Sequence, residues 1–188
     1  MSATAARRAT YEDLLAVPDH LVAEILNGNL VTSPRPGASH AGATTMLTVG
    51  LGPFMFGKGG GPGGWVILVE PELHLDGHVV VPDMAGWRRD RMPEIPDAAA
   101  FDLAPDWVCE VLSPQSTERR DREEKMPIYA HAQARFVWLV NPTTQTLEAY
   151  ALEGEEQWLL LGTWGGDRSV ALKPFDAMEI DLGKLWAR

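Results

Sequence analysis

The sequence is poor in cysteine and has no long apolar run. Its single cysteine, Cys109, excludes an internal disulfide and a zinc site built from cysteines. No segment reaches the about 18 consecutive apolar residues of a membrane-spanning helix, so we expect no membrane span. Residues 1–8 also lack the apolar core of a signal peptide, from which we expect a cytoplasmic protein.

The sequence also has fewer basic than acidic residues. The 188 residues include 26 Asp and Glu against 16 Lys and Arg, which gives a formal net charge of −10. This balance argues against a broad basic face for nucleic acid. The length is typical of one domain with a hydrophobic core, and no linker or internal repeat divides the chain. We therefore expect a single domain over residues 1–188.

Short turn motifs punctuate the chain and predict its secondary structure. Asn27-Gly28 and Asp76-Gly77 each lie between apolar segments and favour a type I′ turn, so each predicts a β-hairpin. A third hairpin is expected about Glu153-Gly154. Helices are expected over residues 11–17, 40–56 and 117–130, the first of them after a capping box that begins at Thr10.

Residues 107–140 are predicted to form a strand, a helix and a second strand. That order favours a right-handed crossover with parallel pairing of the two strands. Pro127 lies inside the predicted helix and is expected to kink it, because proline lacks an amide donor. The fold class is therefore α/β or α+β, with a mixed β-sheet flanked by helices and with added β-hairpins.

Two of the predicted strands carry a carboxylate among apolar residues. Asp83 ends the run over residues 79–83, and Glu110 lies within residues 107–112. A buried charge needs a partner or a metal ion, because its desolvation is otherwise too costly. If the two strands are neighbours, both carboxylates converge on one pocket, where oxygen ligands suit Mg²⁺ or Mn²⁺.

The predicted helix after Glu110 carries Asp121, Lys125 and Tyr129 four residues apart, so these side chains share one side of it. Other short motifs accompany them in a fixed order. They are Tyr11-Glu12-Asp13-Leu14, Glu24-Ile25-Leu26-Asn27-Gly28, Pro34 to His40, Val81-Pro82-Asp83, Pro105 to Pro114, Asp121 to Lys125, Tyr129-Ala130, and Trp138 to Pro142. This ordered set resembles the PD-(D/E)XK restriction-endonuclease-like fold, and more closely its Uma-two family, over about Thr10 to Trp186.

The resemblance implies a metal-dependent endonuclease that cleaves DNA phosphodiester bonds. Asp83 and Glu110 would bind Mg²⁺ or Mn²⁺, with the backbone carbonyl of Val111 as a further ligand. The metal would lower the pKa of a bound water and stabilise charge on the scissile phosphate. A catalytic lysine normally follows the glutamate by two residues, where this chain has Leu112. The resemblance therefore assigns to Lys125 the task of orienting the water or neutralising the transition state.

The resemblance extends to residues beside this pair. Glu24 matches an acidic position that completes the catalytic site. His40 matches a histidine near the cleft, with a role as a ligand or as a phosphate contact. Asp121 and Tyr129 are expected to line the site beside Lys125. The family also tends to pair, and cleavage of a duplex needs both strands attacked, so a homodimer is expected.

Arginines form two groups in the sequence. Arg88, Arg89 and Arg91 are the best local basic cluster and are candidates for contacts with phosphates near the metal. The arginines within residues 119–122 are interleaved with acids, so they are expected on a solvated face. His74 and His78 flank a two-residue turn and should face opposite sides of their hairpin, which argues against a shared metal.

Two other functions compete with the nuclease. The net acidity and Pro127, which interrupts the helix behind Lys125, favour a non-catalytic member of the fold that binds protein or nucleic acid. A third possibility is a metal hydrolase that acts on a small phosphoester.

Overall fold

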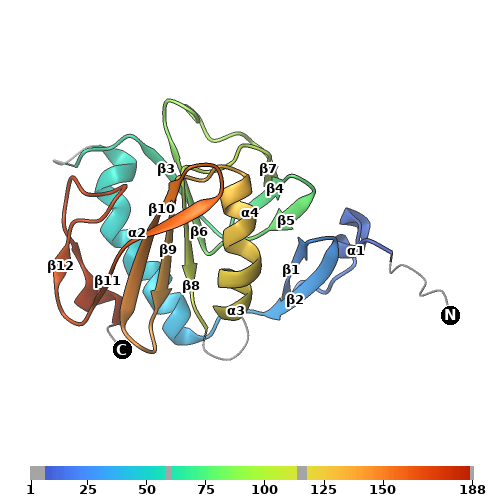
Figure 1. Ribbon diagram of the computed structural model, residues 1–188, viewed down its shortest axis with the longest axis horizontal. Coiled ribbons are helices and arrows are strands. Elements are labelled where there is room, and N and C mark those ends of the chain that lie inside the picture. Colours follow the sequence, from blue (N-terminus) through green and yellow to red (C-terminus); the bar gives the residue numbers. More distant parts are fainter. Residues whose placement is uncertain (1–6, 58–60, 114–117, 187–188) are drawn as a thin grey trace.

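Two β-sheets form the framework of the computed structural model, which describes residues 7–57, 61–113 and 118–186 (Figure 1). The smaller one has five strands in the order β2-β1-β5-β4-β7. Both predicted two-residue turns belong to it, and both have the positive φ angles of a type I′ turn. The strands are β1 (Leu21–Leu26), β2 (Asn29–Pro34), β4 (Glu72–Leu75), β5 (His78–Val80) and β7 (Ala100–Phe101).

The larger sheet has six strands in the order β11-β10-β9-β8-β6-β3. β8 and β9 pair in parallel, as the predicted crossover requires, and the other neighbours are antiparallel. The strands are β3 (Trp65–Val69), β6 (Met84–Arg88), β8 (Trp107–Val111), β9 (Phe136–Asn141), β10 (Thr146–Glu153) and β11 (Gln157–Gly165). A third, two-stranded sheet pairs β12 (Ser169–Val170) with β13 (Ile180–Asp181).

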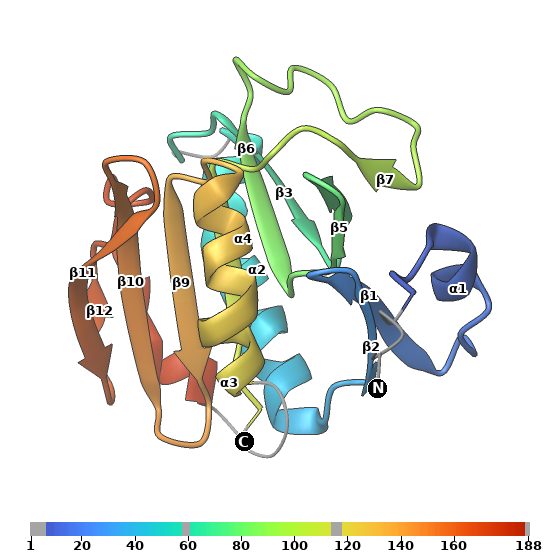
Figure 2. The same ribbon diagram turned by 45° about the vertical axis from the view of Figure 1, so that its right-hand side comes forward.

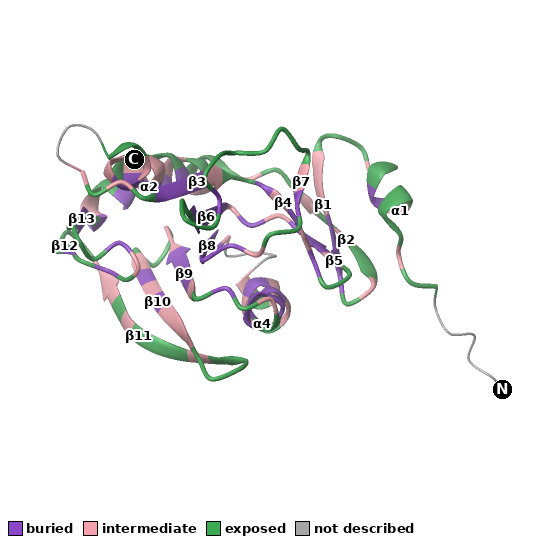
Figure 3. Cartoon of the chain, turned by 90° about the horizontal axis from the view of Figure 1, so that it is seen from above, coloured by how far each residue is buried: buried purple, intermediate pink, exposed green. Residues whose placement is uncertain are grey.

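Helices cover the larger sheet on both faces (Figures 2 and 3). The long helix α2 (Ala38–Phe56) packs on one face with Trp107 and Cys109 of β8, and α4 (Met126–His131) packs on the other with Val108. The mixed sheet and its flanking helices confirm the predicted fold class. The remaining helices are α1 (Tyr11–Leu15), which begins after the predicted cap but ends two residues early, α3 (Glu118–Arg120) and the 3₁₀-helix η2 (Leu182–Trp186).

The helix expected over residues 117–130 has a different form from the predicted kinked α-helix. Between α3 and α4 it contains a π-helix, η1 (Asp121–Lys125), in which the Met126 amide donates to the Asp121 carbonyl. Pro127 follows directly and has no amide to donate. π-helices are rare and occur mostly as single turns of this kind within α-helices, where the regular hydrogen-bond ladder is interrupted. Residue 117, at the predicted start, lies outside the described residues.

The apolar run over residues 79–83 is not one strand. β5 ends at Val80 in the smaller sheet, and β6 starts at Met84 in the larger one. Pro82 separates them, and Asp83 lies at the bend where the chain passes from one sheet to the other. This bend sets the position of the candidate site.

In the described part of the chain, no helix combines the length and the apolar character needed to cross a membrane.

Candidate active site

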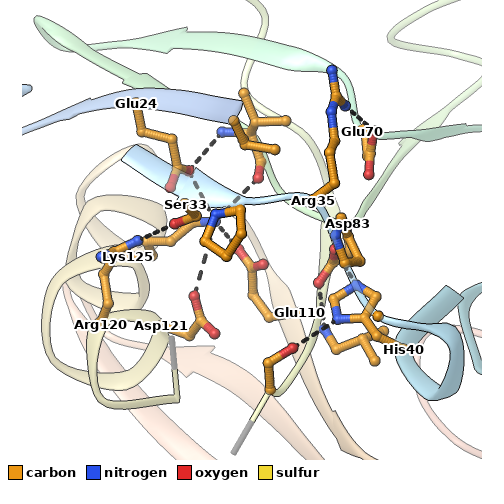
Figure 4. A pocket seen from close by; sticks show the side chains of 17 residues that line it. Glu24, Ser33, Arg35, His40, Glu70, Asp83, Glu110, Arg120, Asp121 and Lys125 are labelled. Carbon is orange, nitrogen blue, oxygen red and sulfur yellow. Dashed lines mark hydrogen bonds and ion pairs between the residues drawn. The ribbon is translucent and has the colours of Figure 1, made fainter. Parts of the chain in front are cut away.

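A pocket with a volume of about 330 Å³ lies where the two sheets meet (Figure 4). Water takes up about 30 Å³ per molecule, so the space is sufficient for a phosphate group and a hydrated ion. Its walls come from both sheets, from the start of α2 and from the helix after β8. The polar lining residues are Glu24, Ser33, Arg35, His40, Glu70, Asp83, Glu110, Ser113, Arg120, Asp121 and Lys125.

Both carboxylate oxygens of Asp83 have partners. Oδ1 lies 2.6 Å from Nε2 of His40, and Oδ2 accepts a hydrogen bond of 2.6 Å from the Val111 amide. The Nδ1 atom of His40 lies 3.2 Å from the Ser113 hydroxyl. The β6–β8 register pairs Met84 with Cys109, so one further step would set Asp83 opposite Glu110 on the same face. The two acids singled out by the sequence therefore share a pocket.

Lys125 is buried among acidic groups. Its Nζ atom lies 2.9 Å from Oε1 of Glu110, 3.0 Å from Oε1 of Glu24 and 3.1 Å from the Val81 carbonyl oxygen. Burial by itself lowers the pKa of Lys125, but the attraction of Glu110 and Glu24 outweighs it and holds the pKa well above its usual value. Lys125 is therefore a charged ammonium group whose three donors all have partners.

Glu110 is held by a second donor from the same helical segment. The Tyr129 hydroxyl donates a hydrogen bond of 2.5 Å to Oε1 of Glu110. Burial raises the pKa of Glu110, Lys125 opposes that change, and neighbouring acids, Asp121 first among them, add to the rise. Burial likewise raises the pKa of Tyr129, so its hydroxyl stays protonated and can donate. Asp121 also approaches Lys125, at 4.0 Å, and lines the same pocket.

Carboxylates outnumber cationic side chains around the pocket. Five acids face three cations, which leaves two negative charges without a counter-charge from the lining residues when all are ionised and His40 is neutral. Three of these acids, Glu24, Glu110 and Asp121, are buried, and a concentration of negative charge attracts a divalent cation. The acids are Glu24, Glu70, Asp83, Glu110 and Asp121, and the cations are Arg35, Arg120 and Lys125.

The donor set at this pocket fits a hard divalent cation. Asp83 and Glu110 supply carboxylate oxygens, and the Val111 carbonyl shares the side of β8 on which the Val111 amide meets Asp83. Within the described ranges, no three His, Cys, Asp or Glu side chains are grouped so as to hold a metal ion by themselves. Two carboxylates, one carbonyl and several waters form an environment that Mg²⁺ accepts. The residues present therefore fit Mg²⁺ or Mn²⁺.

Arg88, Arg89 and Arg91 do not reach this pocket. Arg88 is the last residue of β6 and the other two follow it, at the end opposite Asp83, and a strand of five residues spans about 16 Å. Arg91 pairs at 2.9 Å with the buried Asp106, and Arg89 donates to the Pro93 carbonyl. The strand direction carries the basic cluster away from the acids, so its expected contact with phosphates near the metal has no support in the fold.

Arg35 and Arg120 take the basic positions at the pocket instead. Arg35 lies 3.5 Å from Glu70, and Arg120 donates a hydrogen bond of 2.6 Å to the Ser33 hydroxyl. The expectation that Arg120 belongs to a solvated face is wrong, because it lines the pocket and is only partly exposed. Arg35 lies within the family motif from Pro34 to His40, and that motif could have indicated Arg35 as a residue of the site.

The histidine pair of the second hairpin is arranged as its turn predicts. His74 pairs in register with Val79, and His78 with Leu75, so the two rings face opposite sides. His74 contacts Glu72, whereas Nδ1 of His78 lies 3.1 Å from the Asn27 amide. They form no common site.

Comparisons with known proteins identify the family and the fold of the chain. The profile of the Uma2 family, described as "Putative restriction endonuclease", matches residues 8–183. Among solved structures, a "putative nuclease belonging to DUF820" from Anabaena variabilis is similar, with a TM-score of 0.74, 20% sequence identity, and 95% of this chain and 97% of that chain covered. This likeness shows a shared fold. No curated protein matches the sequence. The chain therefore belongs to the Uma2 family.

Proposed function

We propose that this protein is a metal-dependent endonuclease that hydrolyses DNA phosphodiester bonds in the pocket between its two sheets. The observation that carries the proposal is the convergence of Asp83, Glu110 and Lys125 on that pocket. These are the residue types to which the family pattern assigns cleavage. Membership of the Uma2 family adds support, because the family is described as a nuclease family.

Asp83 and Glu110, together with the Val111 carbonyl, would hold Mg²⁺ or Mn²⁺. Such an ion, when bound, lowers the pKa of a coordinated water and offsets negative charge on the scissile phosphate. His40 and the Val111 amide fix the two oxygens of Asp83, and the Tyr129 hydroxyl fixes one oxygen of Glu110. The site thus has both of its carboxylates oriented in advance, as precise coordination requires.

The resemblance assigns to Lys125 either the orientation of the water or the neutralisation of the transition state, and its contacts favour the second. All three of its donors are engaged, with Glu24, Glu110 and the Val81 carbonyl, so none is directed at a water in this arrangement. Its charge instead reduces the repulsion between Glu24 and Glu110 and holds Glu110 toward the pocket. We propose that Lys125 positions Glu110 and supplies positive charge behind the reacting phosphate.

Incubation of the purified chain with supercoiled plasmid DNA and Mg²⁺ or Mn²⁺ tests this proposal. We expect nicking by the wild type. Asp83→Asn and Glu110→Gln should each slow it by about a thousandfold or more, because each removes a charged ligand. Asp76→Asn is the matched control, since Asp76 lies in an exposed turn outside the pocket and asparagine tolerates its positive φ.

A non-catalytic binding module is the second candidate. The observation in its favour is the full engagement of Lys125, together with the net charge of −10. Salt-sensitive retention of DNA without nicking in either metal would support the binding module and contradict the nuclease. Hydrolysis of bis(p-nitrophenyl) phosphate without any action on DNA would instead support the hydrolase of small phosphoesters.

The pairing of two chains and the cytoplasmic location stay predictions. Sedimentation equilibrium of the purified chain tests the first, and fractionation of cells tests the second. A homodimer should sediment with twice the mass of one chain at every loading concentration above its dissociation constant. A constant monomer mass up to high micromolar concentration would contradict it.

A further inference from the structure

Arg120 differs from the other arginines of its helical segment in what it contacts. It is the last residue of α3, and its Nη1 atom donates a hydrogen bond of 2.6 Å to the hydroxyl of Ser33 on β2. In Figure 4 this pair lies at one side of the pocket, next to Asp121 and Lys125, whereas Arg35 lies at the other side with Glu70. The candidate metal ligands Asp83 and Glu110 line the same pocket as the two arginines.

The neighbouring arginines are both neutralised by acids. Arg119 points to solvent and pairs with Glu123 at 2.7 Å, and Arg122 pairs with Glu148 at 2.6 Å. For Arg120, no ion pair with a carboxylate is found within the described ranges, and its one polar partner is the neutral Ser33 hydroxyl. A guanidinium group has five N–H donors, of which the Ser33 hydroxyl engages one, and the Arg120 side chain lines the pocket.

A partly buried guanidinium group without a counter-charge calls for an anion. A phosphate diester matches its geometry, because two N–H groups of arginine can bind two non-bridging oxygens at once. Ser33 restrains the side chain through one nitrogen and leaves the positive charge uncompensated, which prepares the group for a ligand. A cation is also needed at this pocket, because the carboxylates of Asp83 and Glu110 would otherwise repel a negatively charged substrate.

We propose that Arg120, oriented by Ser33, binds a phosphate group of the substrate. The proposal rests on the proposed function for the identity of that substrate as DNA. It assigns to Arg120 the phosphate contact that the sequence suggested for the cluster at residues 88–91, and it makes Ser33 a positioning residue.

Metal-free binding of a fluorescent 20-base-pair DNA duplex, measured by anisotropy over a series of salt concentrations, tests the assignment. Arg120→Gln should weaken binding about tenfold or more and reduce the slope of log K against log salt by about one, as the loss of one phosphate contact predicts. Arg119→Gln, one residue away and equal in charge change, should alter neither quantity. Ser33→Ala should weaken binding but keep the slope, because the charge remains.

The proposal would be overturned if a folded Arg120→Gln variant bound the duplex with the affinity and the salt dependence of the wild type. Thermal unfolding shows whether the variant is folded. If the wild type binds no DNA, thermal shift with inorganic phosphate separates the two claims. Stabilisation of the wild type by phosphate, absent in Arg120→Gln, would support the phosphate site and contradict DNA as the substrate. Equal phosphate stabilisation in both, or none in either, would overturn the assignment of Arg120.

Discussion

The two ends of strand β6 both gather charged residues, but the charges are arranged differently. At the end that carries the basic cluster, Arg91 is paired with Asp106, and Arg88 lies over the Trp65 ring. At the Asp83 end, acids exceed cations around an open pocket. A dense run of charge in the sequence therefore marks a locally satisfied surface in this fold, whereas an imbalance of buried charge marks the candidate site.

Cleavage should separate the two ends of β6 most sharply. The pair of substitutions Arg88→Gln and Arg89→Gln should leave plasmid nicking within about threefold of the wild type, because neither side chain reaches the pocket. Asp83→Asn, at the opposite end, should reduce it by about a thousandfold or more. Nicking rates measured in parallel at one salt concentration decide this. A large loss in the arginine variant would mean that the distant basic cluster does contact the DNA.

The second largest difference between the two ends of β6 is expected in the free energy of unfolding. Lys125→Met leaves Glu24 and Glu110 buried without their shared cation, which costs about 3–5 kcal/mol. Arg91→Met should cost about 1 kcal/mol, because Arg91 is 39% exposed and Asp106 keeps its bond from the Arg88 amide. Urea unfolding without metal measures both. Equal losses would contradict the picture of Lys125 as the counter-charge of the pocket.

A third prediction concerns the contribution of His40 to metal binding at the Asp83 end of β6. Its ring joins Asp83 to Ser113, so His40→Gln should loosen the Asp83 carboxylate. Loss of such a partner typically weakens metal binding about 10- to 100-fold. Titration calorimetry with Mn²⁺ measures the change, and His74→Gln, in the second hairpin, serves as the control. Unchanged affinity in His40→Gln would place His40 outside the metal site.

The smallest effect is expected at a neutralised pair outside the pocket. The hydrogen bond from Arg122 holds the pKa of Glu148 below its usual value of 4.5. This stabilisation is present above pH 4.5 and is lost as the pH falls through the lowered pKa. Glu148→Gln should therefore cost about 1 kcal/mol at pH 7, with a smaller difference in acid, and should leave nicking unchanged. A loss of nicking would show that this pair also supports the site.

Local sequence rules predicted much of this fold. The Asn27-Gly28 and Asp76-Gly77 turns impose left-handed backbone angles that few other dipeptides tolerate, so both hairpins could be placed. Alternation along β8 correctly separated Glu110 from Cys109, because neighbouring residues of a strand point to opposite faces. The order of strand, helix and strand after residue 107 likewise predicted the parallel pairing of β8 and β9.

What the sequence could not predict depends on contacts between distant segments. The run over residues 79–83 was expected to be one strand, yet its two ends belong to different sheets, and only the packing of those sheets decides where it bends. Arg120 donates to Ser33, 87 residues away in the chain, and the π-turn that follows it at Asp121–Lys125 departs from the regular α-helical spacing. Neither effect can be inferred from the local pattern of charges.

A crystal structure of the full chain grown with Mn²⁺ would test the central claim most directly. An anomalous difference map recorded at the manganese absorption edge should show a peak coordinated by Asp83 and Glu110. The same map from crystals of Glu110→Gln should show a much weaker peak or none at this position. A wild-type pocket free of anomalous density at millimolar Mn²⁺, with the Glu110–Lys125 ion pair intact, would contradict the proposed metal site.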